Sequence, residues 1–323
     1  MRPTASGPRV VALGGGHGLF ASLSALRRVS DSLTAIVTVA DDGGSSGRLR
    51  RDFGVLPPGD LRMALAALCG DDEWGTTWSR VVQHRFGGDS ELAGHAVGNL
   101  LIVALWELLG DTVEGLDWVG RLLGAQGRVL PMAAVPLEIT ATVEGADPAR
   151  PGGLSAVRGQ VACATTAGVI RSIALSPPEP AARPEAVTAV HDADWVVLGP
   201  GSWFTSVLPH LLVPDLAGAM LSSRARRVVV LNLAPQDKGT QDKETAGRPP
   251  SAHLEVLADH APGLRVDVVL ADHQTFGAAG GLEKAADLLG ARLVFADVAM
   301  DDGSPRHDPA RLARAYAQIF EGE

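Results

Sequence analysis

The stretch that decides the fold is Val10-Val11-Ala12-Leu13-Gly14-Gly15-Gly16-His17-Gly18. An apolar run ends in a cluster of glycines, and apolar residues at helical spacing follow as far as Val29. This order predicts a strand over Val10–Leu13, a tight glycine turn and a helix. Glycines let the backbone approach a ligand closely, and a helix N-terminus offers unpaired N–H groups and a positive dipole end. The stretch therefore favours phosphate binding.

The turn lacks the complete dinucleotide motif. The pair Gly14-x-Gly16 is present, but Leu19 stands where a third glycine is expected. The pattern thus favours phosphate without establishing NAD binding, and a turn that binds no ligand remains the alternative. His17 either donates to a phosphate or is simply exposed on the turn. The candidate ligand-binding residues of this loop are Gly14, Gly15, Gly16, His17 and Gly18.

Composition limits the class of protein. The chain has 323 residues, of which 46% are hydrophobic, enough for a large core. We expect a single Rossmann-like nucleotide-binding domain over residues 1–323. No apolar run reaches membrane-spanning length, no leader pattern is visible, and two cysteines are too few for a disulfide framework. These features predict a cytoplasmic protein without membrane insertion. A net charge of −9 and 4% aromatics argue against nucleic-acid binding.

The strand and helix signals alternate over most of the chain. A second strand at Leu33–Val39 follows the first helix, which implies parallel pairing through a right-handed crossover. Residues 41–59 read as a long polar loop, and 71–94 give no clear pattern. Further strands are predicted over Trp195–Leu198, Val228–Leu233, Val266–Ala271 and Leu293–Phe295. Helices are predicted over Asp60–Leu68, His95–Leu109, Thr112–Leu123 and Asp308–Phe320.

Residues 129–175 differ in character from the rest. Short β-rich runs separated by Gly and Pro predict a small antiparallel excursion or β-rich subdomain. The runs are Val129–Leu130, Pro136–Val143, Leu154–Ala162 and Val169–Ala174. The expected fold is therefore an α/β, Rossmann-like, doubly wound and mostly parallel sheet of at least six strands, with this excursion near 129–175. In such sheets the ligand lies beyond the C-terminal strand ends, near the switch point.

Three loops at predicted strand ends carry ligand-type residues, and their convergence is harder to dismiss than one glycine turn. The second loop begins with Asp41 and Asp42, placed where nucleotide-binding folds hold ribose hydroxyls. Adjacent carboxylates could instead hold Mg²⁺ together with phosphate oxygens. Asp60 is a third such carboxylate, although we interpret it first as the N-cap of a helix beginning at Leu61. Phosphate donors in this loop are predicted at Gly43, Ser45, Ser46 and Arg48.

The third loop follows the strand Trp195–Leu198. Its candidate residues are Gly199, Pro200, Gly201, Ser202 and Thr205. Elsewhere, Asn99 could contact a ligand if Gly98 keeps that helix face open, or it could cap locally. Arg306 is a candidate phosphate or sugar contact, and Asp308 is the expected N-cap of the last helix. No Ser/His/Asp arrangement, Walker lysine or zinc motif is legible, so no nucleophile or general base is predicted.

The order of these motifs resembles one family over nearly the whole chain. The matching segments are Gly14–Gly18, Thr38–Arg50, Pro57–Arg62, Leu92–Leu101, Leu198–Ser202 and Arg306–Pro309. They resemble the YvcK-like gluconeogenesis factors, relatives of 2-phospho-L-lactate transferase in the CofD superfamily. The run Ala40–Arg48 is long enough to be highly specific. The transferase branch lacks its glycine-serine part, so the chain is more similar to the YvcK-like branch.

The resemblance implies a bacterial cytoplasmic protein, oligomeric and expected as a homodimer, that binds UDP-N-acetylglucosamine. It also implies a regulatory role in cell shape and wall-precursor metabolism during gluconeogenic growth, with no secure catalytic activity. The alternative is a Mg²⁺-dependent transferase of the 2-phospho-L-lactate transferase type acting on a nucleotide diphosphate conjugate. That branch uses GDP, Mg²⁺ and an aspartate pair that corresponds to Asp42 and Asp60 here.

The chain departs from the family pattern near the ligand. His17 stands where the family often has Thr, and Trp203-Phe204 replaces a common Leu-Tyr pair. A tyrosine associated with the sugar nucleotide is replaced by Arg248 or lost, after a longer loop at Gln236–Gln241. These departures put the identity of the ligand in question while leaving the cleft in place.

Overall fold

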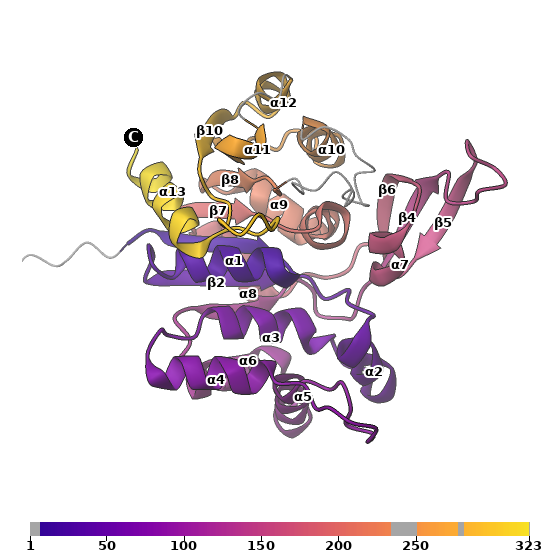
Figure 1. Ribbon diagram of the computed structural model, residues 1–323, viewed down its shortest axis with the longest axis vertical. Helices are drawn as coiled ribbons and strands as arrows, with labels where there is room; N and C mark the ends of the chain where they lie inside the picture. The colour runs from indigo at the N-terminus through magenta and orange to yellow at the C-terminus, as the bar shows by residue number, and fades with distance from the viewer. Residues whose placement is uncertain (1–6, 234–250, 277–280, 323) are drawn as a thin grey trace, which may run out of the picture.

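A seven-stranded parallel sheet forms the centre of the molecule (Figure 1). The structure is a computed structural model that describes residues 7–233, 251–276 and 281–322. The strand order is β10-β9-β8-β7-β1-β2-β3, and every neighbouring pair is parallel. The strands are β1 (Arg9–Gly14), β2 (Ser32–Val37), β3 (Arg128–Pro131), β7 (Trp195–Leu198), β8 (Arg226–Val230), β9 (Val268–Asp272) and β10 (Arg292–Ala296).

Helices connect the strands and enclose the sheet. In β1 every residue after Arg9 is buried, and in β7 all four are buried. Successive side chains of a strand point to opposite faces, so both faces are covered, as a parallel sheet requires. The helices are α1 (Gly16–Leu26), α2 (Gly44–Phe53), α3 (Pro58–Ala67), α4 (Glu73–Gln83), α5 (Val97–Leu109), α6 (Thr112–Leu123), α7 (Gln160–Thr165), α8 (Pro184–Asp192), α9 (Pro214–Ser222), α10 (Ser251–His260), α11 (His273–Phe276), α12 (Leu282–Leu288) and α13 (Pro309–Glu321).

The expected antiparallel excursion is a separate three-stranded sheet. β4 (Glu138–Glu144) lies between β5 (Leu154–Arg158) and β6 (Val169–Ser176), and it is antiparallel to both. Buried and partly exposed residues alternate along β4, so one face is covered, and α7 contacts this strand. Figure 1 shows this sheet projecting from the side of the molecule. The sequence placed the start too early, because Val129–Leu130 belongs to β3 of the parallel sheet.

Two other sequence predictions were wrong, and one region without a clear pattern is now assigned. The polar loop 41–59 contains a helix, α2, which was missed because two glycines in its first turns have low helix propensity. One of them, Gly47, is required there because a Cβ would overlap the carbonyl oxygen of Asp42. The region 71–94, for which no element was predicted, contains α4, capped by the Asp72 side chain, which accepts from the Gly75 N–H. The predicted β-run Leu154–Ala162 ends at Arg158, and α7 follows.

The segment after β7 forms two short non-α turns. It forms a short π-helical turn (η1, Trp203–Val207) and a 3₁₀ turn (η2, Leu208–Leu212). Within the described ranges, no single helix has the length and apolarity to cross a membrane. The segments Trp203–Leu212 and Pro214–Ser222 are long and apolar enough only when taken together, and the chain bends by 80° between them.

Candidate functional site

The loops after β1 and β7 meet at one edge of the sheet. Leu13 of β1 lies opposite Leu198 of the neighbouring parallel strand, so both loops leave in the same direction. From β1 the chain runs one way across the sheet to β2, while β7 begins the other half, which makes this the switch point. Gly18 lies against Pro200, and a Cβ at Gly18 would overlap the Pro200 carbonyl oxygen. The predicted convergence of these two loops is therefore a direct backbone contact.

A cavity of about 650 Å³ opens beside this contact. Its size is typical of pockets that hold small ligands. The β1 loop, the β7 loop, the end of β8 and the loop before α13 all contribute to its wall. The lining residues include His17, Gly18, Phe20, Pro200, Gly201, Ser202, Asn232, Met300, Pro305, Arg306 and His307. We refer to this cavity as the switch-point cleft.

Asn232 holds the β7 loop in place. Its Oδ1 accepts from the Gly201 N–H at 2.8 Å, and its Nδ2 donates to the Gly201 carbonyl at 2.7 Å. Gly201 has a φ of 146°, in the region that favours glycine. Asn232 was not among the predicted site residues, because it lies inside the predicted strand Val228–Leu233. The structure ends β8 at Val230, so its position just past a buried strand is the signal that could have identified it.

Arg306 stands at the rim of the switch-point cleft. Its side chain is exposed, its guanidinium pairs with Asp302 at 3.1 Å, and its Nε donates to Ser304 Oγ at 3.1 Å. The neighbouring His307 is buried, and burial lowers the pKa of its imidazole to about 4. Asp308 caps α13, as predicted, by accepting from the N–H groups of Ala310 and Arg311.

A second, smaller cavity of about 200 Å³ lies at the N-terminus of α2. Five of the predicted site residues line it, together with two arginines. The lining comprises Asp41, Gly43, Gly44, Ser45, Ser46, Gly59, Asp60, Arg62, Met63 and Arg85. We refer to it as the α2 cavity.

Ser45 joins two buried side chains behind the α2 cavity. Its Oγ accepts from Asn99 Nδ2 at 3.0 Å and lies 3.0 Å from His95 Nδ1. Partial burial and the nearby charge of Arg48 lower the pKa of His95, which favours the neutral imidazole. Gly98 does not open this face for a ligand, because a Cβ there would lie 2.8 Å from Arg62 Cγ. Asn99 is therefore placed to orient Ser45.

Asp41, and not Asp42, faces Asp60. Burial and the charge of Asp41 raise the pKa of Asp60 to about 7, although a hydrogen bond from the Gly16 backbone and the charge of Arg62 oppose the shift. Asp42 instead accepts from the Val161 N–H of α7 at 3.1 Å. The two carboxylates nearest a bound cation would thus be Asp41 and Asp60. In the part of the chain that is described, no group of three or more His, Cys, Asp or Glu side chains could hold a metal ion.

The N-cap interpretation of Asp60 was wrong. α3 begins at Pro58 and its N-cap position is Pro57, so Asp60 lies within the first helical turn. A proline at the first position of a helix fixes φ and lacks only an N–H that would have no partner in the helix. The helix can therefore begin at Pro58, three residues before the predicted start at Leu61. Arg48 was placed among the phosphate donors, but its guanidinium donates to the Ala93 carbonyl at 2.7 Å.

A third cavity of about 300 Å³ joins the first two. It shares His17 and Phe20 with the switch-point cleft, and Arg62, Met63 and Arg85 with the α2 cavity. Gln83 completes its lining. The three cavities therefore neighbour one another, with the third between the other two, and we call the row of three the groove. We refer to the middle part as the connecting cavity.

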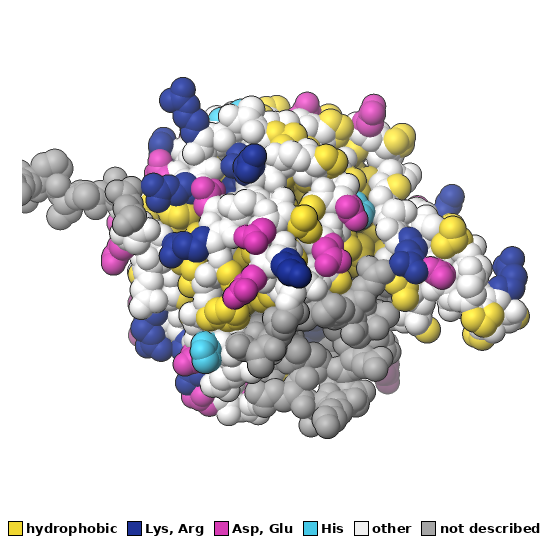
Figure 2. Space-filling model, turned by 90° about the horizontal axis from the view of Figure 1, so that it is seen from above, with side chains coloured by type: hydrophobic (Ala, Val, Ile, Leu, Met, Phe, Trp, Pro, Cys, Tyr) yellow, Lys and Arg dark blue, Asp and Glu magenta, His cyan; other side chains and the backbone are white. Residues whose placement is uncertain are grey.

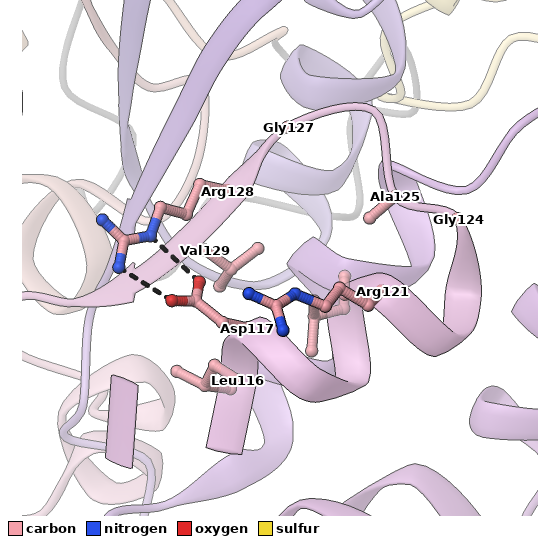
Figure 3. Close-up of a pocket in the computed structure, with 10 residues that line it drawn as sticks. Leu116, Asp117, Arg121, Gly124, Ala125, Gly127, Arg128 and Val129 are labelled. Carbon is pink, nitrogen blue, oxygen red and sulfur yellow. Dashed lines mark hydrogen bonds and ion pairs between the residues drawn. The ribbon is translucent and has the colours of Figure 1, made fainter. Parts of the chain in front are cut away.

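A separate cavity of about 370 Å³ lies away from this groove, beside α6 (Figure 3). It adjoins Arg128, the first residue of β3, and thus the opposite edge of the parallel sheet. Asp117 accepts from Arg128 Nε at 2.9 Å and from a terminal nitrogen at 2.8 Å. Its one carboxylate is thus engaged in a bidentate pair, and none of the predicted site residues lies there.

Comparison with known proteins identifies the family. The model of the family described as 2-phospho-L-lactate transferase CofD matches residues 10–300. The chain belongs to the CofD family. A putative gluconeogenesis factor of Mycobacterium tuberculosis (strain H37Rv) is 53% identical over 307 residues, covering 94% of this chain and 88% of the relative. A gluconeogenesis factor of Listeria monocytogenes is 35% identical, covering 98% and 97%.

The CofD-family fold is also seen in a solved relative. The crystal structure of a UPF0052 family member from Bacillus halodurans superimposes with a TM-score of 0.82 at 32% identity, covering 97% of this chain and 99% of that one. The sequence had predicted both the fold and the YvcK-like resemblance, and both are confirmed.

The departures noted in the sequence fall in different places. Trp203 and Phe204 are buried, with 1% and 3% exposure, and the Trp203 ring lies 5.2 Å from that of His253. These two aromatic residues therefore belong to the core of the CofD-family fold and not to the wall of the cleft. The segment Gln236–Gln241 and Arg248 lie outside the described residues.

Proposed function

We propose that this CofD-family protein binds a nucleotide sugar, UDP-N-acetylglucosamine, in the switch-point cleft. The observation that carries the proposal is the contact of the β1 and β7 glycine loops beside a cavity of about 650 Å³. The N-terminus of α1 contributes His17 and Gly18 to the cleft and brings the positive end of the helix dipole to it, which suits a diphosphate, although the Gly16 N–H already donates to Asp60. Arg306 at the rim adds a guanidinium, the group best matched to phosphate geometry.

The proposed role is regulatory. Relatives at 35% and 53% identity carry the name gluconeogenesis factor. We propose that the chain acts as a cytoplasmic, homodimeric sensor that couples nucleotide-sugar supply to cell shape and wall-precursor metabolism during gluconeogenic growth. Acidic and basic side chains are interspersed over the face drawn in Figure 2, a pattern consistent with a small-molecule ligand and not with a nucleic acid.

Thermal unfolding with a panel of nucleotides tests this proposal. A ligand present at about 100 times its Kd stabilises the folded state by about 2.7 kcal/mol, which raises the unfolding temperature by several degrees. UDP-N-acetylglucosamine should give this rise, and GDP and NAD should not. A rise with GDP or NAD alone would refute the nucleotide-sugar assignment.

The alternative is a Mg²⁺-dependent transferase, and one observation favours it. Asp41 and Asp60 share the α2 cavity, and Mg²⁺ is commonly bound through one or two carboxylates plus phosphate oxygens. Incubation with UDP-N-acetylglucosamine, Mg²⁺ and a metabolite extract, followed by chromatography of released UDP or UMP, decides between the two. Turnover above that of an Asp41→Asn, Asp60→Asn double variant would replace the sensor by an enzyme. Equal background in both would support the sensor.

A further inference from the structure

Arg62 is a buried cation whose Nε has no hydrogen-bond partner. Its side chain is 4% exposed, and its Nε is buried with no hydrogen-bond partner. Among the described residues, no hydrogen bond or ion pair involves its guanidinium. Buried charges in folded proteins are ordinarily hydrogen-bonded, paired or bound to a ligand. The charges of Asp60 and Asp41, which line the α2 cavity together with Arg62, favour its charged form but make no ion pair with it. On the side of the connecting cavity the guanidinium meets no carboxylate, which indicates an anion that comes from outside the chain.

The structure holds Arg62 in a fixed position. Its stem crosses Gly98 of α5, where a Cβ would lie 2.8 Å from Arg62 Cγ and 2.8 Å from Val82 Cβ. Glycine at this position thus makes room for the arginine stem. The residue itself is on α3, a helix packed against α1, α4 and α5. The guanidinium is consequently anchored on rigid elements, which is the arrangement expected of a binding residue.

The guanidinium borders a cavity lined by hydrogen-bond donors. Arg62 and Arg85 both line the connecting cavity, together with His17 and the amide of Gln83. No carboxylate is among its lining residues. Arg85 is exposed, and one terminal nitrogen of its guanidinium donates to the Gly94 carbonyl at 2.9 Å. Its other terminal nitrogen is available to a ligand. Burial and the charge of Arg85 lower the pKa of Arg62 to about 10, so both arginines remain charged at neutral pH.

We propose that Arg62 and Arg85 bind the anionic group of a second ligand, a small carboxylic acid or phosphate ester, in the connecting cavity. Two guanidinium groups that repel each other across a cavity are stabilised by an anion between them. A volume of about 300 Å³ admits a metabolite of a few carbon atoms and is too small for a whole nucleotide sugar. The site adjoins the switch-point cleft through His17 and Phe20, so the two ligands would lie side by side.

This second site does not depend on the nucleotide proposal. An anion bound at Arg62 is expected whichever nucleotide occupies the cleft. The sharing of His17, however, predicts that the two sites are coupled: each ligand changes the affinity for the other by the same factor. Such coupling would let the protein respond to two metabolites at once.

Titration with simple anions tests the second site. Inorganic phosphate and succinate are titrated separately into the full chain at constant ionic strength, with binding followed by calorimetry and by the unfolding temperature. The Arg62→Met variant keeps the length of the stem and removes the charge. We expect it to lose at least about tenfold in affinity for the anion that binds, as for the loss of one charge-assisted contact. Arg80→Gln, at an exposed arginine of α4 outside the cavity, is the matched control and should bind as the wild type does.

Stability separates a binding role from a structural one. Without added anions, Arg62→Met should unfold at the same temperature as the wild type or higher, because burial and Arg85 together disfavour this charge more than Asp60 and Asp41 favour it. A clear fall in that temperature, or unchanged anion affinity in the variant, would overturn the proposal, as would the absence of any binding to the wild type.

Nucleotide binding, measured on the same variants, keeps the two proposals distinguishable. UDP-N-acetylglucosamine should bind Arg62→Met and the wild type with similar affinity, and phosphate should still bind when the nucleotide is saturating. If phosphate is instead displaced competitively, the guanidinium serves the nucleotide and the second ligand is refuted. If the nucleotide does not bind at all while phosphate binding depends on Arg62, the anion site stands and the nucleotide proposal fails.

Discussion

Gly18 of α1 lies in backbone contact with Pro200 of the β7 loop, so closely that no side chain fits between them. The two residues are 182 positions apart in the chain and meet because β1 and β7 are adjacent parallel strands. This contact fixes the spacing of the two glycine loops that border the switch-point cleft. Adding a single methyl group at Gly18 should therefore disturb the proposed ligand site.

The change Gly18→Ala should separate the two loops. The added Cβ overlaps backbone atoms of Pro200 and Gly201, which cannot rotate away, so we expect a loss of about 1–3 kcal/mol in unfolding free energy. Affinity for UDP-N-acetylglucosamine, measured by calorimetry, should fall at least tenfold. Gly218→Ala in α9 is the control, since that position is open and helical, and it should raise stability slightly. Unchanged affinity in Gly18→Ala would show that the loop spacing is not critical.

Removal of the Asn232 side chain should loosen the β7 loop. The variant Asn232→Ala loses both hydrogen bonds to Gly201, and we expect a cost of about 1–3 kcal/mol in denaturant unfolding. Binding to the cleft should weaken in parallel, because Gly201 lines its wall. Gln274→Ala, at an exposed position, should change neither quantity. A stable Asn232→Ala protein with full affinity would show that the two hydrogen bonds to Gly201 do not hold the β7 loop in place.

Arg306→Ala should weaken nucleotide binding without destabilising the fold. The side chain is exposed and its pair with Asp302 is a surface ion pair, which contributes little to stability. A hydrogen bond to a charged group contributes about 1.5–3 kcal/mol, so we expect a roughly 10- to 150-fold loss of affinity. A loss below twofold would assign Arg306 to the solvated rim.

The carboxyl of Asp60 should make stability depend on pH. Its pKa of about 7 in the folded protein lies above its ordinary value of 3.8. Between these two pH values the folded state therefore binds the proton more tightly than the unfolded state does. Stability must therefore fall as pH rises from about 4 to 7, by at most about 4 kcal/mol. Urea unfolding in the presence of a chelator, compared between wild type and Asp60→Asn, isolates this contribution. If the free energy of unfolding changed with pH in the same way for both proteins between about pH 4 and 7, the raised pKa of Asp60 would be refuted.

The strands were predictable because their signal is local. Continuous apolar runs such as Val10–Leu13 and Trp195–Leu198 end at glycines, and a strand buried on both faces must look this way. The helix α2 was hidden because its glycines and serines favour a loop on propensity alone. Close packing of Gly47 against Asp42 requires glycine there, and tertiary contact overrides propensity.

The sequence predicted which loops form the site. It did not predict which side chains of those loops face one another. The convergence of the β1 and β7 loops was expected because both loops follow parallel strands, whereas the order that places β7 beside β1 is seen only in the structure. Whether Asp41 or Asp42 faces Asp60 depends on which carboxylate the N–H of Val161 engages, a contact across 119 positions. Arg62 belongs to a motif segment but was not predicted as a site residue, because nothing local indicates that its guanidinium is buried with an Nε that lacks a hydrogen bond.

The most direct test of the central claim is a calorimetric titration of UDP-N-acetylglucosamine into the purified full chain, with the Gly201→Val variant in parallel. The proposal predicts saturable binding to the wild type at one site per chain and none to the variant, because a side chain at Gly201 fills the wall of the switch-point cleft. Circular dichroism should show that the variant remains folded. Absence of heat with the wild type, or equal affinity in the folded variant, would contradict the claim that this cleft holds the nucleotide sugar.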